Sequence, residues 1–217
     1  MKLSENIQKK QELALKIIEI LEKTYPDADC TLDFETPLQL LIATQLAAQC
    51  TDARVNLVTP ALFEKYKTVY DFAGADENEL MELIRSTGFY RNKAKNIIAC
   101  CKKIISDFGG EVPKTMNELL TLPGVGRKTA NLVLGDIFGI PGIVVDTHAT
   151  RLSNRMGLTK NRDPYKIELD LLKIIPPDAQ SSFCHRLVFH GRKFCDARKP
   201  NCNECPLNHI CPQIGVK

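Results

Sequence analysis

This 217-residue sequence contains no long apolar run and no repeated segment that stands out. No apolar stretch approaches the ~18 residues needed to cross a bilayer, so no transmembrane helix is expected. The opening residues, MKLSEN, lead into a polar helical pattern without the apolar region of a signal peptide. Without repeats or low-complexity tracts, repeat architectures are also excluded. These absences predict a globular, cytoplasmic protein of one large or two small domains.

A strong excess of one charge is absent as well. The chain carries 29 Lys and Arg against 26 Asp and Glu, a net charge of +3. Such a balance neither requires nor excludes a nucleic-acid partner, because the local distribution of charge matters more than its total. A composition of 44% hydrophobic and 25% charged residues is that of an ordinary globular protein.

Strand signals are nearly absent, whereas helix signals recur along the chain. Residues 4–25 lack Gly and Pro and place Leu13, Ile17 and Leu21 on one face of an amphipathic helix. The sequence predicts an all-α protein of about ten helices. The expected helices are 4–25, 37–48, 68–74, 77–86, 92–108, 116–121, 127–138, 147–156 and 179–190, with two more starting at Thr51-Asp52, bent or restarted at Thr59-Pro60, and at Asp163-Pro164.

A tight turn followed by a helix lies at residues 122–130, LPGVGRKTA. The glycines allow positive φ and close approach of a partner. The free N–H groups and the positive dipole end of the following helix favour an anion. Lys128, in the first helical turn, would lie beside any phosphate held there. This pattern fits a site of nucleic-acid chemistry, but the same turn can be a purely structural helix start.

Two other polar features interrupt the helical pattern. Gln49, at the end of the predicted helix 37–48, either satisfies buried backbone or points into a cleft. The segment Gly88–Arg91, sequence GFYR, is predicted to be an aromatic and basic loop before the helix 92–108. The lysines around this helix are typical of a solvated surface, although they follow an exposed aromatic loop.

The nine cysteines divide into two groups. Five lie among apolar residues and are expected to be small buried side chains: Cys30, Cys50, Cys100, Cys101 and Cys184. The other four have the spacing C-x6-C-x2-C-x5-C: Cys195, Cys202, Cys205 and Cys211. In a cytosolic protein such a cluster indicates a metal site rather than disulfides.

The spacing of the four clustered cysteines bears on the metal. Both zinc and a [4Fe-4S] cluster accept four thiolates. Only one close Cys-x-x-Cys pair is present, and the wider gaps favour the bulkier iron–sulfur cluster over zinc. Five cations surround the cysteines and either meet DNA phosphates or balance the charge of a cluster: Arg186, Arg192, Lys193, Arg198 and Lys199.

Taken together, these motifs resemble the endonuclease III family of helix-hairpin-helix DNA glycosylases with AP-lyase activity. The resemblance covers nearly the whole chain and rests on the cysteine spacing and on four segments: LAAQCTD (46–52), GFYRNKA (88–94), LPGVGRKTAN (122–131) and VDTH (145–148). It implies a six-helix barrel domain with the hairpin at residues 30–140. A helical domain of residues 1–29 and 141–217 would hold a [4Fe-4S] cluster on Cys195, Cys202, Cys205 and Cys211. DNA would lie across the cleft between the domains.

The resemblance also implies roles for single residues. Lys128 matches the catalytic lysine of the family and Asp146 the catalytic aspartate, although Asp146 is also placed to cap a helix. Gln49 would fill the gap left by a flipped base. Phe89 stands where the family commonly has an aliphatic wedge, so the chain departs from the family pattern at this position. The remaining expected DNA contacts are Gly124, Val125, Gly126, Arg127 and His148, the last of which either contacts phosphate or satisfies polar groups in the core.

The implied activity is that of a bifunctional DNA glycosylase and AP lyase in base excision repair. Its substrate would be double-stranded DNA containing oxidised pyrimidines or abasic sites. The enzyme would be a monomer associated with the nucleoid. Two alternatives stay open: a monofunctional glycosylase for mismatched or alkylated bases, and a DNA-damage-binding module without catalysis. Because the adenine-mismatch branch usually lacks the lysine, Lys128 argues against a monofunctional enzyme.

Overall fold

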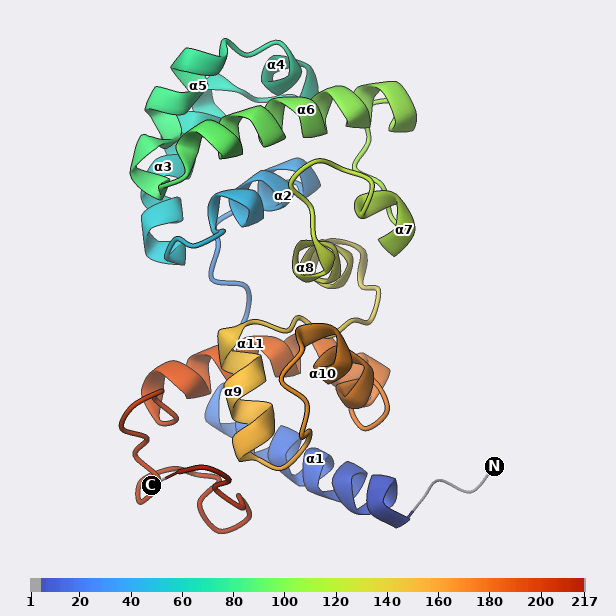
Figure 1. The fold of residues 1–217 in the computed structure, drawn as a ribbon, viewed down its shortest axis with the longest axis vertical. Coiled ribbons are helices and arrows are strands. Elements are labelled where there is room, and N and C mark those ends of the chain that lie inside the picture. The colour runs from blue at the N-terminus through green and yellow to red at the C-terminus, as the bar shows by residue number, and fades with distance from the viewer. Residues whose placement is uncertain (1–4, 217) are drawn as a thin grey trace. The chain divides into compact units, whose positions relative to one another are not determined.

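The computed structural model describes residues 5–216 (Figure 1). Within this range every regular element is a helix and no strand is present, so the predicted all-α class is confirmed. The helices of the described range are α1 (Glu5–Thr24), α2 (Pro37–Leu46), α3 (Asp52–Lys65), α4 (Val69–Ala73), α5 (Glu77–Ile84), η1 (Arg85–Thr87), α6 (Tyr90–Phe108), α7 (Met116–Leu119), α8 (Arg127–Phe138), α9 (Thr147–Arg155), α10 (Pro164–Leu171), η2 (Pro177–Ala179) and α11 (Gln180–Lys193). None of these helices is both long and apolar enough to span a membrane.

The chain divides into two compact units, Met1–Asp29 with Ile140–Lys217, and Cys30–Gly139. The first unit is built on α11, which packs against α1 and α9, while α10 packs on α9. Its core contains Ile17, Leu21, Phe183 and Leu187, all fully buried. The cysteine loop after α11 packs on the same core through three of its cysteines. Packing of these cysteines on the core therefore anchors the loop within this unit.

The second unit is built around α6, which packs against α4, α5 and α2, while α2 also packs against α8. Side chains cap most of its helices, and two of these caps were predicted from the sequence. Thr36 accepts the N–H of Gln39 at the start of α2, and Thr51 accepts that of Arg54 at the start of α3. A restart of the helix at Thr59-Pro60 is wrong, because α3 continues through Pro60. Burial of Val55 and Leu62 on the same helix helps to offset the hydrogen bond that proline removes.

Two helix ends differ from the sequence-based boundaries. Helix α2 ends at Leu46, so Gln49 lies in the turn that follows and not on the helix. Helix α6 begins at Tyr90, so the aromatic loop is shorter than expected and Phe89 is the residue before the helix. Cys30 and Cys50 are half-buried rather than buried, whereas Cys100, Cys101 and Cys184 are buried as expected. The half-buried pair lies in connecting segments, where less of the fold covers a side chain.

Arg186 does not belong to the surface cations around the cysteines. Its side chain is only 7% exposed and lies in the core of the first unit. The guanidinium pairs with Glu22 of α1 at 3.2 Å and donates to the carbonyl of Tyr25 at 3.4 Å. Arg186 therefore ties α11 to the end of α1, so the interpretation that it meets DNA or balances a cluster is wrong.

Candidate functional site

The turn before α8 requires glycine at one of its two positions. Gly124 has φ +77°, and a Cβ built there would lie 2.6 Å from Oε1 of the buried Gln45 and 3.0 Å from Cβ of Asn96. Gly126, in contrast, is extended at φ −104° and has open space around a built Cβ. Close packing of the hairpin against α2 and α6 thus demands glycine at 124, while 126 is the residue before the helix.

The start of α8 offers backbone donors to a ligand. Gly126 provides no side-chain cap, so the first-turn N–H groups of the helix lack the cap that Thr36 gives α2. The side chain of Lys128 is exposed in this turn. Val125 differs from its neighbours, because its side chain is buried and its N–H donates to the carbonyl of Leu122 at 3.1 Å. An anion and an amine can therefore meet at the first turn of α8.

Asp146 and His148 lie at the start of α9. The half-buried Asp146 caps the helix, with its Oδ1 accepting the N–H of Ala149 at 2.7 Å. Nδ1 of His148 lies 3.1 Å from a guanidinium nitrogen of Arg151, which also donates to the carbonyl of Gly191. A Cβ at Gly191 would collide with the His148 ring, so α9 and α11 can approach this closely only at glycine.

The two residues expected to meet the gap in DNA share an unusual backbone conformation. Gln49 has φ +54° and Phe89 has φ +49°, and Gln213 is the one other non-glycine residue with positive φ in the described part of the chain. Both Gln49 and Phe89 are exposed, and 61% of the Phe89 surface is accessible. Left-handed backbone at a non-glycine residue is costly and tends to mark functional sites.

Lys93, near the start of α6, bonds the helix ends that come before these two residues. Its side chain is only 6% exposed, and Nζ donates to the carbonyls of Leu46 and Thr87 at 2.7 and 2.8 Å. Burial lowers the pKa of this amine, while the nearby Cys50 acts in the opposite direction. The sequence indicated a solvated lysine here, and that interpretation is wrong. The exposed Lys128 and the buried Lys93 thus have opposite environments within one unit.

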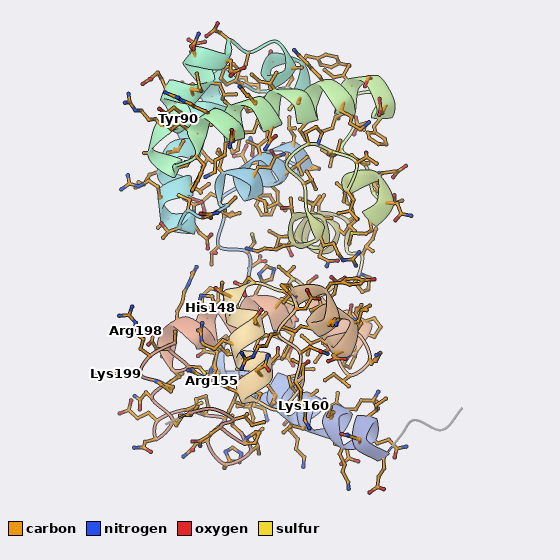
Figure 2. The ribbon with its side chains drawn as sticks, in the orientation of Figure 1. Tyr90, His148, Arg155, Lys160, Arg198 and Lys199 are labelled. Atoms are coloured by element: carbon orange, nitrogen blue, oxygen red, sulfur yellow. The ribbon has the colours of Figure 1, made fainter. Side chains whose placement is uncertain are left out.

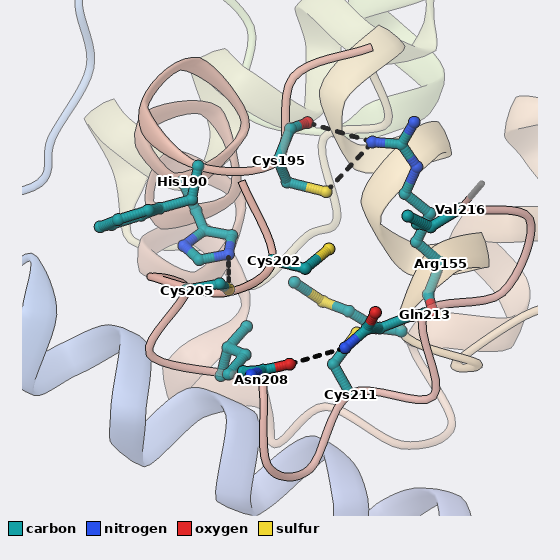
Figure 3. Close-up of a pocket in the computed structure, with 12 residues that line it drawn as sticks. Arg155, His190, Cys195, Cys202, Cys205, Asn208, Cys211, Gln213 and Val216 are labelled. Carbon is teal, nitrogen blue, oxygen red and sulfur yellow. Dashed lines mark hydrogen bonds between the residues drawn. The ribbon is translucent and has the colours of Figure 1, made fainter. Parts of the chain in front are cut away.

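The four clustered cysteines line one cavity in the first unit, as Figure 3 shows. About 370 Å³ of this pocket is free of protein atoms, a volume that includes space open to solvent. Within residues 5–216, no group of three or more His, Cys, Asp or Glu side chains is placed to hold a single metal ion. The sulfur atoms instead surround a space, which fits a bulky cluster better than one tetrahedral zinc ion. Burial raises the pKa of Cys205 and Cys211, a penalty that a bound cationic centre offsets.

Side chains around the cavity hold the cysteine loop (Figure 3). Arg155, at the end of α9, donates to Sγ of Cys195 at 3.3 Å and to the carbonyls of Asp196 and Ala197 at 2.6 and 2.9 Å. From the same helix, Nε of Arg151 donates to the Cys195 carbonyl at 3.1 Å. The helix capped by Asp146 is therefore also the helix that fixes the first cysteine.

His190 contacts another cysteine. Its Nε2 lies 3.3 Å from Sγ of Cys205, and its Nδ1 lies 3.2 Å from the hydroxyl of Tyr25. Burial lowers the pKa of His190 to about 4 and raises that of Tyr25 to about 12, so both are neutral near pH 7. A metal-bound thiolate can only accept a hydrogen bond, so Nε2 then carries the proton and Tyr25 donates to Nδ1.

Sequence reasoning missed the residues that support the site. Each of these residues contacts a group distant in the sequence, so no local spacing marks it. They are Tyr25, Lys93, Arg151, Arg155 and His190. Arg198 and Lys199 beside the cysteines are exposed as expected (Figure 2), and their backbone N–H groups donate to Asp196. Lys128 and the hairpin belong to one unit, and Asp146, His148 and the cysteines to the other.

Comparison with known proteins identifies the class to which this fold and these sites belong. Residues 42–177 match the model of the HhH-GPD superfamily base excision DNA repair proteins, and residues 195–211, from the first to the last clustered cysteine, match the iron–sulfur binding domain of endonuclease III. The protein is thus an HhH-GPD base excision DNA repair protein with an iron–sulfur cluster. Within that superfamily, the chain belongs to the endonuclease III family.

Individual relatives support the assignment along nearly the whole chain. Endonuclease III of Synechocystis sp. is 57% identical over 94% of this chain and 93% of its own, and that of Bacillus subtilis is 48% identical over 86% of each. A solved structure of a trapped endonuclease III–DNA covalent intermediate, 46% identical, matches with a TM-score of 0.89 over 94% of this chain and 96% of its own. The predicted family and the predicted iron–sulfur cofactor are confirmed.

Proposed function

We propose that Lys128 and Asp146 carry out the chemistry of this DNA glycosylase and AP lyase. The damaged base is first flipped out of the duplex, because it cannot be reached in the stack. The free amine of Lys128 attacks C1′ of the sugar, and the C–N bond to the base breaks with its electron pair leaving on the base. The C1′–O4′ bond of the sugar ring then breaks with its electron pair leaving on O4′, which takes up a proton. The resulting Schiff base acidifies the C2′ proton, whose loss expels the 3′ phosphate by β-elimination. The exposed Lys128 amine in the uncapped first turn of α8 is the observation that carries this proposal.

Asp146 is proposed to stabilise positive charge on the sugar and to assist proton transfer. Its Oδ1 accepts the N–H of Ala149, which fixes the orientation of the carboxylate. A side chain oriented in this way presents its charge without reorganisation during the reaction. Capping and catalysis are therefore compatible roles for Asp146.

DNA is proposed to contact the second unit through the hairpin and through the two left-handed residues. Gly124 and Gly126 would offer backbone N–H groups to a phosphate, with Arg127 beside them at the start of α8. Gln49 would occupy the gap left by the flipped base, and the exposed Phe89 ring would stack or wedge beside it. Val125 would contribute by shaping the turn, since its side chain is buried and its N–H donates to the carbonyl of Leu122. His148 would approach a phosphate while contacting Arg151.

The proposed substrates are oxidised pyrimidines, such as thymine glycol, and abasic sites in double-stranded DNA. A solved relative forms a trapped covalent intermediate with DNA, which supports a covalent step here. With Cys195, Cys202, Cys205 and Cys211 as its proposed ligands, the [4Fe-4S] cluster would be structural because thiolates fill every coordinating position. It would hold the loop that exposes Arg198 and Lys199 to the DNA backbone. A monomer in the cytoplasm, bound to the nucleoid, fits this activity.

Separate measurement of base release and strand cleavage tests this function. On a duplex with one thymine glycol, the wild-type protein is expected to release the base and cleave the strand. Lys128→Ala is expected to lose both, whereas Lys102→Ala, at an exposed lysine of α6, keeps both. Base release without cleavage would overturn the lyase step and indicate a monofunctional enzyme. Binding without either product would indicate a damage-binding module.

A further inference from the structure

The carbonyls bound by Lys93 belong to the C-terminal residues of two helices. Leu46 ends α2 and Thr87 ends η1, and both are buried. A carbonyl at a helix end has no acceptor role within its own helix, and the helix dipole makes that end negative. One amine, donating to both at 2.7 and 2.8 Å, therefore caps two helix ends at once.

The residues that follow these two ends are those expected at the DNA gap. Gln49 comes three residues after Leu46, and Phe89 two residues after Thr87. Each adopts the left-handed conformation, at φ +54° and +49°. Such backbone persists only where the surrounding structure holds it. The backbone N–H of Lys93 adds a further bond, to the carbonyl of Phe89 at 3.1 Å.

We infer that Lys93 is a positioning residue that holds Gln49 and Phe89 together in the conformation needed to fill the gap in the duplex. The inference rests on the proposed DNA contacts of these two residues. The amine has no access to substrate, since it is buried and turned to two carbonyls, so it takes no part in bond breaking. The Lys93 amine bonds the residue that precedes each segment. A shift of the backbone at one helix end therefore alters the hydrogen bond at the other.

Comparison of duplex and single-stranded abasic substrates tests this role. A single strand has no gap to fill, so cleavage there needs Lys128 but not the ordered segments. Lys93→Met keeps the length of the side chain and removes the donors. We expect it to slow single-turnover cleavage of the abasic duplex about tenfold and to change cleavage of the single strand less than about twofold. Lys102→Met, which removes an exposed amine from the same helix, should leave both rates at the wild-type value.

A double-mutant cycle measures the coupling between Lys93 and Gln49 in the cleavage rate. A general loss of stability would not produce such coupling. If Lys93 acts by placing Gln49, then Gln49→Ala should slow the duplex reaction much less in the Lys93→Met background than in the wild type. Equal loss on both substrates, no loss on either, or additive effects would overturn the inference. Circular dichroism checks folding, and Lys93→Gln serves if Lys93→Met is unfolded. Unfolding of both variants would also overturn it, because the amine would then support the whole unit. Failure of the wild type to cleave either substrate would instead count against the proposed function.

Discussion

Oδ1 of Asp146 accepts the backbone N–H of Ala149 at 2.7 Å, so one carboxylate both begins α9 and stands at the proposed reaction site. Two substitutions separate these roles. Asn caps helices as well as Asp, so Asp146→Asn should keep the stability of the wild type and lower the rate of base release about 10²- to 10⁴-fold. Asp146→Ala should lose the same rate and also about 1 kcal/mol of stability.

Asp163, which caps α10 through the N–H of Lys166, is the matched control for these variants. Asp163→Asn should leave both the stability and the rate of base release unchanged. Asp163→Ala should lower the stability and leave the rate unchanged. Thermal unfolding and single-turnover kinetics measure the two effects. A normal rate for Asp146→Asn would mean that the residue is a helix cap and nothing more.

The two hairpin glycines should respond differently to alanine. Gly124→Ala places a Cβ against Oε1 of Gln45 and strains a backbone at φ +77°, so we expect a loss of about 1–3 kcal/mol. Gly126→Ala meets open space at an extended φ and should change stability by less than about 0.5 kcal/mol.

DNA binding gives the second measure for this pair. The added methyl of Gly126→Ala stands at the start of α8, where phosphate is proposed to approach, so affinity for an abasic duplex should fall although the fold is intact. Unchanged affinity would remove the start of α8 from the DNA-binding surface. Equal stability of the two variants would contradict the packing of Gly124 on Gln45.

Arg155 should govern how firmly the iron–sulfur cluster is retained. Its guanidinium holds Sγ of Cys195 and the next two carbonyls, and loss of such supporting bonds typically costs about 10- to 100-fold in metal affinity. Arg155→Met should therefore lose iron and the absorbance near about 400 nm faster than the wild type during exposure to a chelator. Arg162→Met, at an exposed position of the same unit, is the control. Equal rates of loss would show that the cysteines alone hold the cluster.

Local patterns predicted the features that depend on neighbouring residues. Thr36-Pro37 marked the start of α2, and Asp163-Pro164 that of α10, because capping chemistry is read within three or four residues. The all-helical class followed from periodicity, and the iron–sulfur cluster was expected from four closely spaced cysteines. Each of these signals is contained in a short segment of sequence.

Features that depend on tertiary contacts were missed. From the sequence alone, Lys93 is predicted to be a surface lysine. In the structure its amine is buried and donates to the terminal carbonyls of α2 and η1. The sequence likewise predicts Arg186 to be a surface cation. In the structure it bonds Glu22 and the carbonyl of Tyr25, which lie near the other end of the chain. The partners of such side chains lie in distant segments of the chain. Hydrophobic periodicity describes one segment at a time, so it cannot show which segments pack together.

Location of the covalent bond to DNA tests the central claim most directly. The wild-type protein is incubated with an abasic duplex and borohydride, which reduces a Schiff base to a stable amine. The adduct is then digested and mapped by mass spectrometry. We predict that the added mass lies on Lys128 and that Lys128→Ala forms no adduct. An adduct on another amine, or none with folded wild-type protein, would contradict the assignment of Lys128 as the nucleophile.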